Sequence, residues 1–378
     1  MVDKKKPHVM IFVGTRPEAV KMAPVLKALR RQSHRFRCSL VSTGQHREML
    51  QQALQSFDID VDLDLAIMQP SQTLAGLTAA AVQACDQVLA SQRPDIVLVQ
   101  GDTTTVVAAS LAAFYQRIPV GHVEAGLRTG DSYNPFPEEM NRSLMARLAT
   151  YHFAPTSDAA ANLQREGVSE ACIHVTGNTV VDALEVLQKS FCEAMVSDNV
   201  RKAVARSGDR LVLVTCHRRE SLGHDLDVIV QALETLARQF PDRLFFFPVH
   251  LNPSVRQQIL PRLRGISNVL LSDPITYQDM MHCLSKAELV LTDSGGLQEE
   301  APSFHVPCLV LRRTTERPEG IKAGFTALAP LDHDGLTRTV AEWLQSDRRH
   351  LLKGQPNPYG DGKAAERIVE ILAEELAD

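Results

Sequence analysis

Aromatic residues and long apolar runs are both scarce in this chain. Of its 378 residues, 5% are aromatic and one is a tryptophan. No run reaches the roughly 18–20 apolar residues that a membrane-spanning helix needs. The apolar stretch after Lys6 is too short for a signal peptide and indicates a first strand instead. We therefore expect a cytoplasmic protein with no membrane partner.

Cysteine is also sparse, and none of the seven cysteines forms a C-x-x-C pair. This spacing argues against a disulfide framework and against a thiolate zinc site, and it suits a reduced compartment. Cys216 beside His217 is a nucleophile candidate, although a small buried residue at a strand end is the favoured explanation. The net charge of −5 provides no basic face for nucleic acid.

Short apolar runs alternate with helical patterns along the whole chain. The runs are rich in Val, Ile and Leu, as in parallel strands that are covered on both faces. This alternation predicts an α/β fold with parallel sheets. The expected strands are His8–Val13, Phe36–Val41, Ile96–Gln100, Val120–Val123, His152–Ala154, Ile173–Thr176, Leu211–Thr215, Leu244–Val249, Val269–Leu271, Leu289–Leu291, Cys308–Leu311 and Ala327–Ala329.

A dozen strands exceed what one open sheet comfortably holds, and the length of the chain also favours two domains. The turn signal at Thr176–Asn178 and the strandless helical stretch over 184–206 mark the boundary. We expect one domain to end near residue 176 and a second to follow it.

The loop after the first strand, Val13–Glu18, is a candidate anion site. Pro17 is suited to the first position of the helix that follows. The N–H groups there, together with Arg16 and Lys21, suit a phosphate. An ordinary β–α turn with a solvated arginine explains the same residues.

Two acids end expected strands in the first half, Asp102 and Glu124. Open α/β sheets place their ligands at this edge. If the two strands are neighbours, the acids could repel each other and raise one pKa into the range of a proton-transfer catalyst. The alternatives are that Asp102 or Thr103 caps the next helix and that Glu124 pairs with Arg128.

A third acid, Glu138, lies in the first turn of a helix that begins at Pro137. This placement is favourable for the helix dipole, and Glu138 and Arg142 are spaced as an i,i+4 pair. Local physics therefore does not assign a function to Glu138.

Two histidines end strands in the second half. His217 is followed by Arg218 and Arg219, which suits proton transfer or phosphate binding and favours a neutral imidazole. His250 could contact a ligand or be satisfied within its own loop.

A glycine-rich loop follows the strand Leu289–Leu291. Ser294, Gly295 and Gly296 open a helix, so exposed N–H groups there suit a diphosphate. Glu300, one turn further, is placed to accept hydrogen bonds from ribose hydroxyls, and Arg317 could close on the same ligand.

In combination, these motifs resemble the non-hydrolysing UDP-N-acetylglucosamine 2-epimerases. The resemblance spans nearly the whole chain and is carried by residues 14–18, 101–105, 123–129, 137–139, 217–220, 293–296, 315–319 and 357–362. It implies two Rossmann-like domains that face a central cleft, as in glycosyltransferases of the B type. The domains would cover 1–176 plus 363–378, with the C-terminal helix returning to the first domain, and 177–362, which would bind UDP.

The resemblance also implies an activity and a set of roles. The reaction interconverts UDP-N-acetylglucosamine and UDP-N-acetylmannosamine by removal of the C2 proton, elimination of UDP and its re-addition, without NAD or a metal. Members are usually homodimers. The acid–base candidates are Asp102, Glu124, Glu138 and His217, and the UDP contacts are Arg16, Ser294, Gly295, Gly296 and Glu300.

Many family members bind a second UDP-sugar as an activator. Gln45, His46, Gln72 and Arg218 fall in the matching region, but Ser71 stands where some relatives have an arginine, so activation is in doubt. His305 is a further departure, expected to be a loop change. The alternatives are an epimerase of a related UDP-sugar such as a UDP-diacetamido-uronic acid, a glycosyltransferase of the same fold, a hydrolysing epimerase and a non-catalytic nucleotide-sugar sensor.

Overall fold

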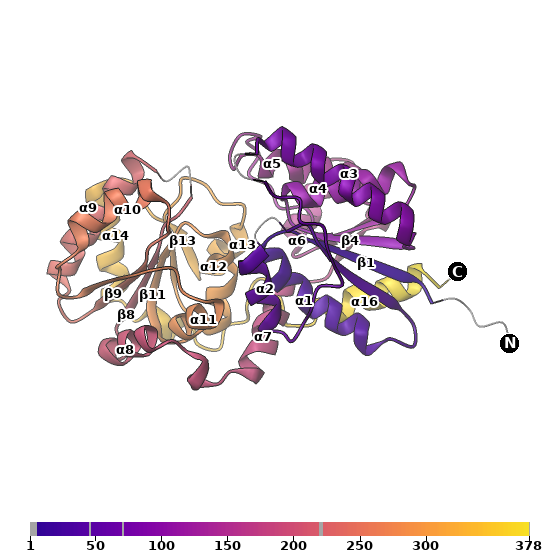
Figure 1. The fold of residues 1–378 in the computed structure, drawn as a ribbon. Coiled ribbons are helices and arrows are strands. Elements are labelled where there is room, and N and C mark those ends of the chain that lie inside the picture. The colour runs from indigo at the N-terminus through magenta and orange to yellow at the C-terminus, as the bar shows by residue number, and fades with distance from the viewer. Residues whose placement is uncertain (1–5, 45–46, 70–71, 219–221, 378) are drawn as a thin grey trace. The chain divides into compact units, whose positions relative to one another are not determined.

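A computed structural model describes residues 6–44, 47–69, 72–218 and 222–377 of the chain (Figure 1). The chain divides into two compact units. Unit 1 comprises residues 1–189 and 359–378, and unit 2 comprises residues 190–358.

Unit 1 is built on a seven-stranded sheet in the order β3-β2-β1-β4-β5-β6-β7, in which all pairs are parallel. Parallel neighbours need crossover connections, and helices supply them. The strands are β1 (His8–Val13), β2 (Arg37–Ser42), β3 (Leu63–Asp64), β4 (Ile96–Gln100), β5 (Val120–Val123), β6 (Tyr151–Ala154) and β7 (Ile173–Val175). The helices are α1 (Arg16–Arg31), α2 (Arg47–Gln55), α3 (Leu74–Gln92), α4 (Thr104–Tyr115), α5 (Glu138–Leu148), α6 (Ser157–Arg165), α7 (Thr179–Ser190) and α16 (Ala364–Glu375).

Unit 2 repeats the design with a six-stranded parallel sheet in the order β10-β9-β8-β11-β12-β13. The strands are β8 (Leu211–Thr215), β9 (Leu244–Pro248), β10 (Val269–Ser272), β11 (Ala287–Thr292), β12 (Cys308–Val310) and β13 (Thr326–Leu328). The helices are α8 (Asp198–Ser207), α9 (His224–Gln239), α10 (Pro253–Leu263), α11 (Tyr277–Lys286), α12 (Gly295–Glu300), α13 (Pro318–Lys322), α14 (His333–Gln345) and α15 (Arg348–Leu352).

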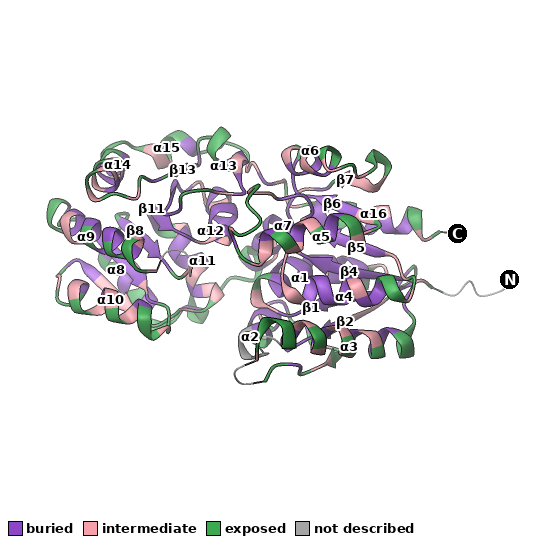
Figure 2. Cartoon of the chain, turned by 90° about the horizontal axis from the view of Figure 1, so that it is seen from above, coloured by how far each residue is buried: buried purple, intermediate pink, exposed green. Residues whose placement is uncertain are grey.

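The core of each unit lies on both faces of its sheet. Every residue of β1, β4 and β8 is buried, and Figure 2 shows the strands buried and the outer helix faces exposed. In unit 2, separate apolar clusters cover the two faces, one around Phe247 and Ile229 and the other around Phe246 and Leu284. This double coverage explains why the strands are apolar at every position rather than at alternate ones.

The C-terminal helix α16 packs on α1 of unit 1, as the resemblance predicted. Its first N–H groups, of Ala364 and Ala365, donate to the Asp182 carboxylate of α7 at 3.2 and 2.8 Å. Burial raises the pKa of Asp182 to about 6. This anchor groups α7 with unit 1, whereas the boundaries predicted from the sequence, after 176 and before 363, leave α7 in the second domain.

All twelve predicted strands are present, with ends that differ by a residue or two. The sequence missed β3, a two-residue edge strand too short to give a periodic signal. Within the described part of the chain, no helix is both long and apolar enough to cross a membrane. The seven cysteines are free, and Cys216 is buried directly after β8.

Candidate active site

Each sheet has one point where the strand order reverses, and ligands of open α/β sheets bind outside the carboxyl ends of the strands there. In unit 1 this point lies between β1 and β4, and in unit 2 between β8 and β11. The loops that follow these four strands carry Arg16, Asp102, His217 and Ser294. The sheet topology therefore groups the predicted residues into one cluster in each unit.

The turn after β1 needs a glycine because its neighbours leave no room for a side chain. A Cβ on Gly14 would lie 2.2 Å from the Thr105 Oγ1 and 2.7 Å from the Thr43 Oγ1. Arg16 is half-buried in the first turn of α1 and makes no ion pair with any residue that the structure describes. Its guanidinium is therefore available for an anion.

Glu18 links the two loops at the switch point of unit 1. Its buried carboxylate accepts hydrogen bonds from the N–H groups of Gly14, at 2.5 Å, and Thr15, at 2.7 Å. The same carboxylate accepts from the hydroxyl of Thr103, which follows β4 and caps α4. Burial raises the pKa of Glu18 to about 7, and the nearby charge of Asp102 acts in the same direction.

Asp102 pairs with Arg142 of α5. The Arg142 Nε and Nη2 atoms lie 2.8 and 2.6 Å from the Asp102 Oδ2, and Glu139 pairs with Arg142 at 2.9 Å. From β5, the His122 Nε2 lies 2.7 Å from the carbonyl oxygen of Gly101, and burial lowers the pKa of His122 to about 3. The Asp102 turn is thus held by two neighbouring elements, and a neutral histidine provides one of the contacts.

Glu124, at the end of β5, forms a buried ion pair with Lys21 of α1 and accepts from the Asn178 Nδ2 at 3.2 Å. Its φ of +65° is uncommon for a residue with a side chain, and such strain gathers at functional sites. The sequence also offered Lys21 as a phosphate contact. In the structure its ammonium group pairs with Glu124, and the phosphate contact stays a prediction. Arg128, the alternative partner of Glu124, pairs with Glu166 at 2.7 Å.

The predicted repulsion between Asp102 and Glu124 is replaced by two separate ion pairs, because each acid has its own cation. Glu18, at the switch point of unit 1, is a carboxyl whose pKa burial raises. Glu138 is the half-buried first residue of α5. Its neighbour Glu139 is buried and accepts from the N–H groups of Thr129 and Gly130, so it stabilises the preceding loop.

In unit 2, His217 lies against a buried carboxylate. The Asp293 Oδ2 accepts the N–H groups of His217 and Arg218, both at 2.8 Å, and the Asp293 Oδ1 lies 3.3 Å from the His217 Nδ1. The sequence predicted a neutral imidazole because of the adjacent arginines, and that protonation state stays a prediction. The His250 ring stacks on that of His217, with centroids 6.1 Å apart, while its Nδ1 accepts from the N–H of Asn252.

The glycine-rich loop begins α12 as predicted. Ser294 is its N-cap, and a Cβ on Gly295 would lie 2.6 Å from the Arg317 guanidinium. A Cβ on Gly296 would meet nothing closer than 3.7 Å. The Tyr277 hydroxyl donates to the Glu300 Oε1 at 3.1 Å and orients the predicted ribose acceptor.

Arg317 supports this loop from within the core. It is buried, and its guanidinium donates to Glu299 and Glu316. Arg312 pairs with Glu316 at 3.0 Å, so the loop rests on a buried network of two cations and two anions. With this arrangement the charge of Arg317 is compensated by protein groups.

Four residues are predicted to contact an activator, Gln45, His46, Gln72 and Arg218. Gln45, His46 and Ser71 lie outside the described residues. Gln72 precedes α3 and accepts from the N–H of Gln69 at 3.3 Å, and Arg218 is in unit 2. The activator site stays a prediction.

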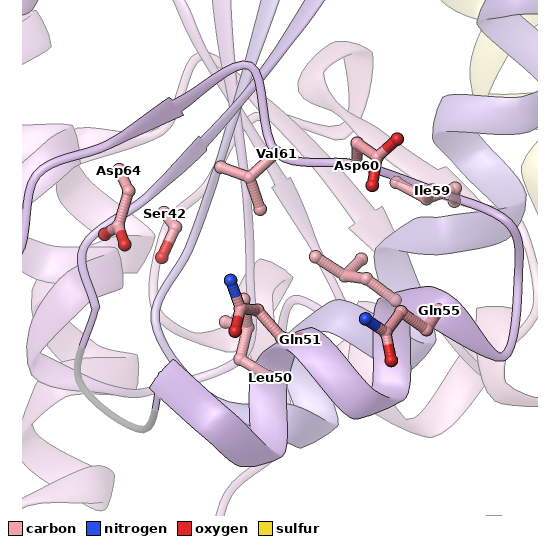
Figure 3. A pocket seen from close by; sticks show the side chains of 9 residues that line it. Ser42, Leu50, Gln51, Gln55, Ile59, Asp60, Val61 and Asp64 are labelled. Carbon is pink, nitrogen blue, oxygen red and sulfur yellow. The ribbon is translucent and has the colours of Figure 1, made fainter.

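Two cavities lie apart from these clusters. One, of about 210 Å³, lies in unit 1 between α2 and the 59–64 segment, where Figure 3 shows Gln51 and Gln55 beside Asp60 and Val61. The other, of about 630 Å³, lies in unit 2 along α9 and α14 and includes His333. Neither is lined by a predicted site residue, and no metal-binding group of three or more His, Cys, Asp or Glu side chains occurs in the described ranges.

Sequence reasoning assigned no role to Glu18, Asn178 or Tyr277. A signal for Glu18 was present, because Thr15 to Glu18 has the T-x-x-E spacing of a capping box, which the structure contains. Asn178 and Tyr277 reach their partners over 54 and 23 residues, and no local pattern could have found them.

Known proteins are similar to this chain in sequence and in fold. Residues 27–373 match a family model described as UDP-N-acetylglucosamine 2-epimerase. A protein of that name from Escherichia coli is 47% identical over 371 residues, which cover 96% of this chain and 98% of the relative. The chain belongs to the UDP-N-acetylglucosamine 2-epimerase family. Like the family, it is an isomerase.

Other members of the UDP-N-acetylglucosamine 2-epimerase family are also similar to this chain over nearly its whole length. The Bacillus subtilis protein of that name is 45% identical over 369 residues and covers 97% of this chain and 95% of the relative. The crystal structure of UDP-GlcNAc 2-epimerase from Neisseria meningitidis bound to UDP-GlcNAc superposes with a TM-score of 0.89 at 43% identity. It covers 97% of this chain and 100% of that chain. The predicted family and two-domain parallel α/β fold are confirmed.

Because burial raises the pKa of Glu18, its ionisation at higher pH should lower the free energy of unfolding of the wild type. Glu18→Gln should remove this dependence on pH. The unfolded chain loses this proton near pH 4.5, whereas the folded chain keeps it up to about pH 7, so the folded state binds more protons in that interval. As pH rises from 4.5 to 7, the free energy of unfolding of the wild type should therefore fall relative to that of Glu18→Gln. The change is about 3 kcal/mol at most.

Urea unfolding followed by far-UV circular dichroism measures this difference, since the one tryptophan, Trp343, lies in unit 2 and does not report on unit 1. Glu370→Gln, at an exposed position of α16, is the matched control and should show no pH-dependent difference. A constant difference between wild type and Glu18→Gln across this range would contradict the buried-carboxyl interpretation.

Proposed function

We propose that this epimerase interconverts UDP-N-acetylglucosamine and UDP-N-acetylmannosamine by inversion at C2. The observation that carries the proposal is Glu124, a buried carboxylate at positive φ that ends β5 and is held by Lys21 and Asn178. A strained and charged group at the ligand-binding edge of a sheet indicates a chemical role. The names of the E. coli and B. subtilis relatives support the same substrate.

The chemistry requires two kinds of group. The C2 proton has no adjacent carbonyl to acidify it, so its removal must be assisted by departure of the UDP anion from C1. The C2–H electron pair then forms the C1–C2 double bond of a glycal, and the reverse addition delivers a proton to the other face of C2. This sequence needs a preorganised site for the diphosphate and acid–base groups for both faces of the sugar.

Acid–base roles fall to Asp102, Glu124, Glu138 and His217. The first two are carboxylates paired with buried cations, Asp102 with Arg142 and Glu124 with Lys21. His217 lies beside Asp293 and is partly exposed, as a proton-transfer group must be to reach a substrate. Glu138 is half-buried at the start of α5 and can serve as a third carboxyl.

UDP-binding roles fall to Arg16, which is not neutralised by another described residue, and to the α12 start at Ser294, Gly295 and Gly296. Glu300 accepts hydrogen bonds from the ribose hydroxyls, and the ring of His250, in the loop after β9, stacks on that of His217. Lys21 and Arg317 act indirectly in this proposal. Both are buried in ion pairs, with Glu124 and with Glu299 and Glu316, and they fix the groups that touch the substrate.

We also propose that the chain forms a homodimer through α5 and the turn before it. Tyr133, Phe136, Met140 and Leu144 are 80%, 59%, 44% and 45% exposed, and the rings of Tyr133 and Phe136 stack at 6.4 Å. Met140 and Leu144 are four residues apart and share one face of α5. Exposed apolar side chains gathered along one element are typical of protein interfaces.

The first experiment incubates the enzyme with UDP-N-acetylglucosamine in D2O and follows the sugar by proton NMR. We expect deuterium at C2 together with the signals of UDP-N-acetylmannosamine. Glu124→Gln should lower both rates by about 10²-fold or more, the usual contribution of a general acid or base. Removal of the charge leaves the shape of the side chain in place.

Glu370→Gln is the control for Glu124→Gln, because it removes an exposed carboxylate of α16 in the same unit. It should leave the rate unchanged. Absence of exchange in the folded wild type would reject the proposed substrate and point to another UDP-sugar or to a transferase. Wild-type turnover by Glu124→Gln would remove that residue from the mechanism.

A pair of glycine substitutions tests the diphosphate site. Gly295→Ala brings a methyl group against the fixed Arg317 guanidinium, so we expect UDP affinity, measured by calorimetry, to fall together with the melting temperature. Gly296→Ala meets no protein atom closer than 3.7 Å, so the melting temperature should stay unchanged. Its methyl group would instead occupy space at the proposed diphosphate site, so UDP affinity should fall. Wild-type affinity in both variants would exclude this loop as the UDP site.

The homodimer is tested by light scattering after size-exclusion chromatography. Met140→Glu with Leu144→Glu should shift the mass from twice the chain mass toward the 41.7 kDa of one chain, because charges oppose burial in an interface. Leu351→Glu, at a position 70% exposed in unit 2, is the control and should leave the mass unchanged. A monomeric wild type, or a dimer indifferent to the α5 charges, would contradict this interface.

A further inference from the structure

Asp293 is a fully buried carboxylate at the switch point of unit 2. It follows β11, whose last residue Thr292 is in register with Thr215 of β8, so Asp293 lies beside the start of the loop that carries His217. The Asp293 N–H donates to the Thr215 carbonyl oxygen at 3.3 Å, which fixes its backbone. An ionised group without solvent must be satisfied by protein donors.

The two oxygens of this carboxylate face different groups. Oδ2 accepts the backbone N–H groups of His217 and Arg218, both at 2.8 Å. These two bonds set the plane of the carboxylate, and Oδ1 lies 3.3 Å from the His217 Nδ1 without forming a hydrogen bond in the structure. The His217 side chain is 43% exposed, so one nitrogen faces the buried acid and the ring still reaches the surface.

A second contact limits the rotation of the imidazole. The His250 ring lies nearly parallel to that of His217, with an interplanar angle of 21°. The Nδ1 of His250 is occupied by the N–H of Asn252, so this ring is itself held by its loop. The His217 ring is therefore defined from its edge by Asp293 and from its face by His250.

We propose that Asp293 is a positioning residue that fixes the tautomer of His217. A carboxylate only accepts hydrogen bonds, and a neutral imidazole has one donor and one acceptor nitrogen. Proximity to Oδ1 places the proton on Nδ1 and leaves the Nε2 lone pair for the proton that His217 exchanges with the sugar or its leaving group. This inference rests on the acid–base role proposed for His217.

A purely structural role for Asp293 makes a different prediction. In that case its function ends with the two backbone hydrogen bonds, and an asparagine, whose side-chain oxygen can accept both, should replace it. If Asp293 fixes the tautomer, the asparagine fails, because its amide presents a donor to Nδ1 and favours the imidazole with its proton on Nε2.

The experiment compares Asp293→Asn with wild type under saturating UDP-N-acetylglucosamine. We expect kcat to fall by about 10²-fold or more while KM changes little, because the wrong tautomer affects the chemical step rather than substrate binding. Asp225→Asn, which removes a carboxylate from the exposed pair with Arg313 in the same unit, is the matched control and should keep wild-type kcat.

A double-mutant cycle separates this inference from the proposed function. Once His217→Ala has removed the imidazole, Asp293→Asn should have no further effect on kcat. Independent, multiplying losses would overturn the positioning role. Wild-type activity of His217→Ala would reject the role proposed for His217, whereas an impaired His217→Ala beside a fully active Asp293→Asn would overturn only the inference about Asp293.

A spectroscopic measurement keeps the test decisive if Asp293→Asn does not fold. The ¹⁵N shifts of the His217 ring, assigned among the 13 histidines by their loss in His217→Ala, report which nitrogen carries the proton in the neutral form. We expect a protonated Nδ1 in the wild type and, where the variant folds, a protonated Nε2 in Asp293→Asn. A wild-type ring with its proton on Nε2 would overturn the proposal.

Discussion

At the switch point of each sheet, a buried carboxylate holds together two loops that sheet topology alone would let diverge. The chain leaves the two central strands toward helices on opposite faces, so the N–H groups at the strand ends lose their ladder partners. Glu18 accepts from the loop after β1 and from Thr103 after β4. Asp293, after β11, accepts from the loop after β8. These two links fix the loops that carry Arg16, Thr103 and His217.

The cost of burying charge explains which site residues are paired. Lys21, Arg142 and Arg317 are buried, and each has a carboxylate partner that offsets the loss of water. Arg16 differs, since it is half-buried and has no ion-pair partner among the described residues. An unneutralised guanidinium at a helix start is suited to an incoming diphosphate, because the attraction is not already satisfied within the protein.

The sequence predicted the strands, the fold class and the loops that carry the site, because apolar runs and strand-end polar residues are local signals. It could not predict pairings. Lys21 is three residues from Glu18 and five from Arg16, which made a phosphate contact plausible, yet its partner Glu124 is 103 residues away. The arginines beside His217 are its neighbours in the sequence, whereas Asp293, whose carboxylate lies against this histidine, is 76 residues further along the chain. Charge balance at a site is set by such distant partners.

Reversal of configuration at C2 needs one group ready to accept a proton and another ready to donate one. Asp102 and Glu124 are each paired with a buried cation, Arg142 and Lys21. A donor must then come from a group without such a cation bound to it. His217 differs from these two acids, because its Nδ1 faces the Asp293 carboxylate rather than a buried cation. Under the proposed function, the lysine beside Glu124 suits this residue to accept a proton, and the aspartate beside His217 suits the imidazole, once it carries a proton on both nitrogens, to donate one from Nε2.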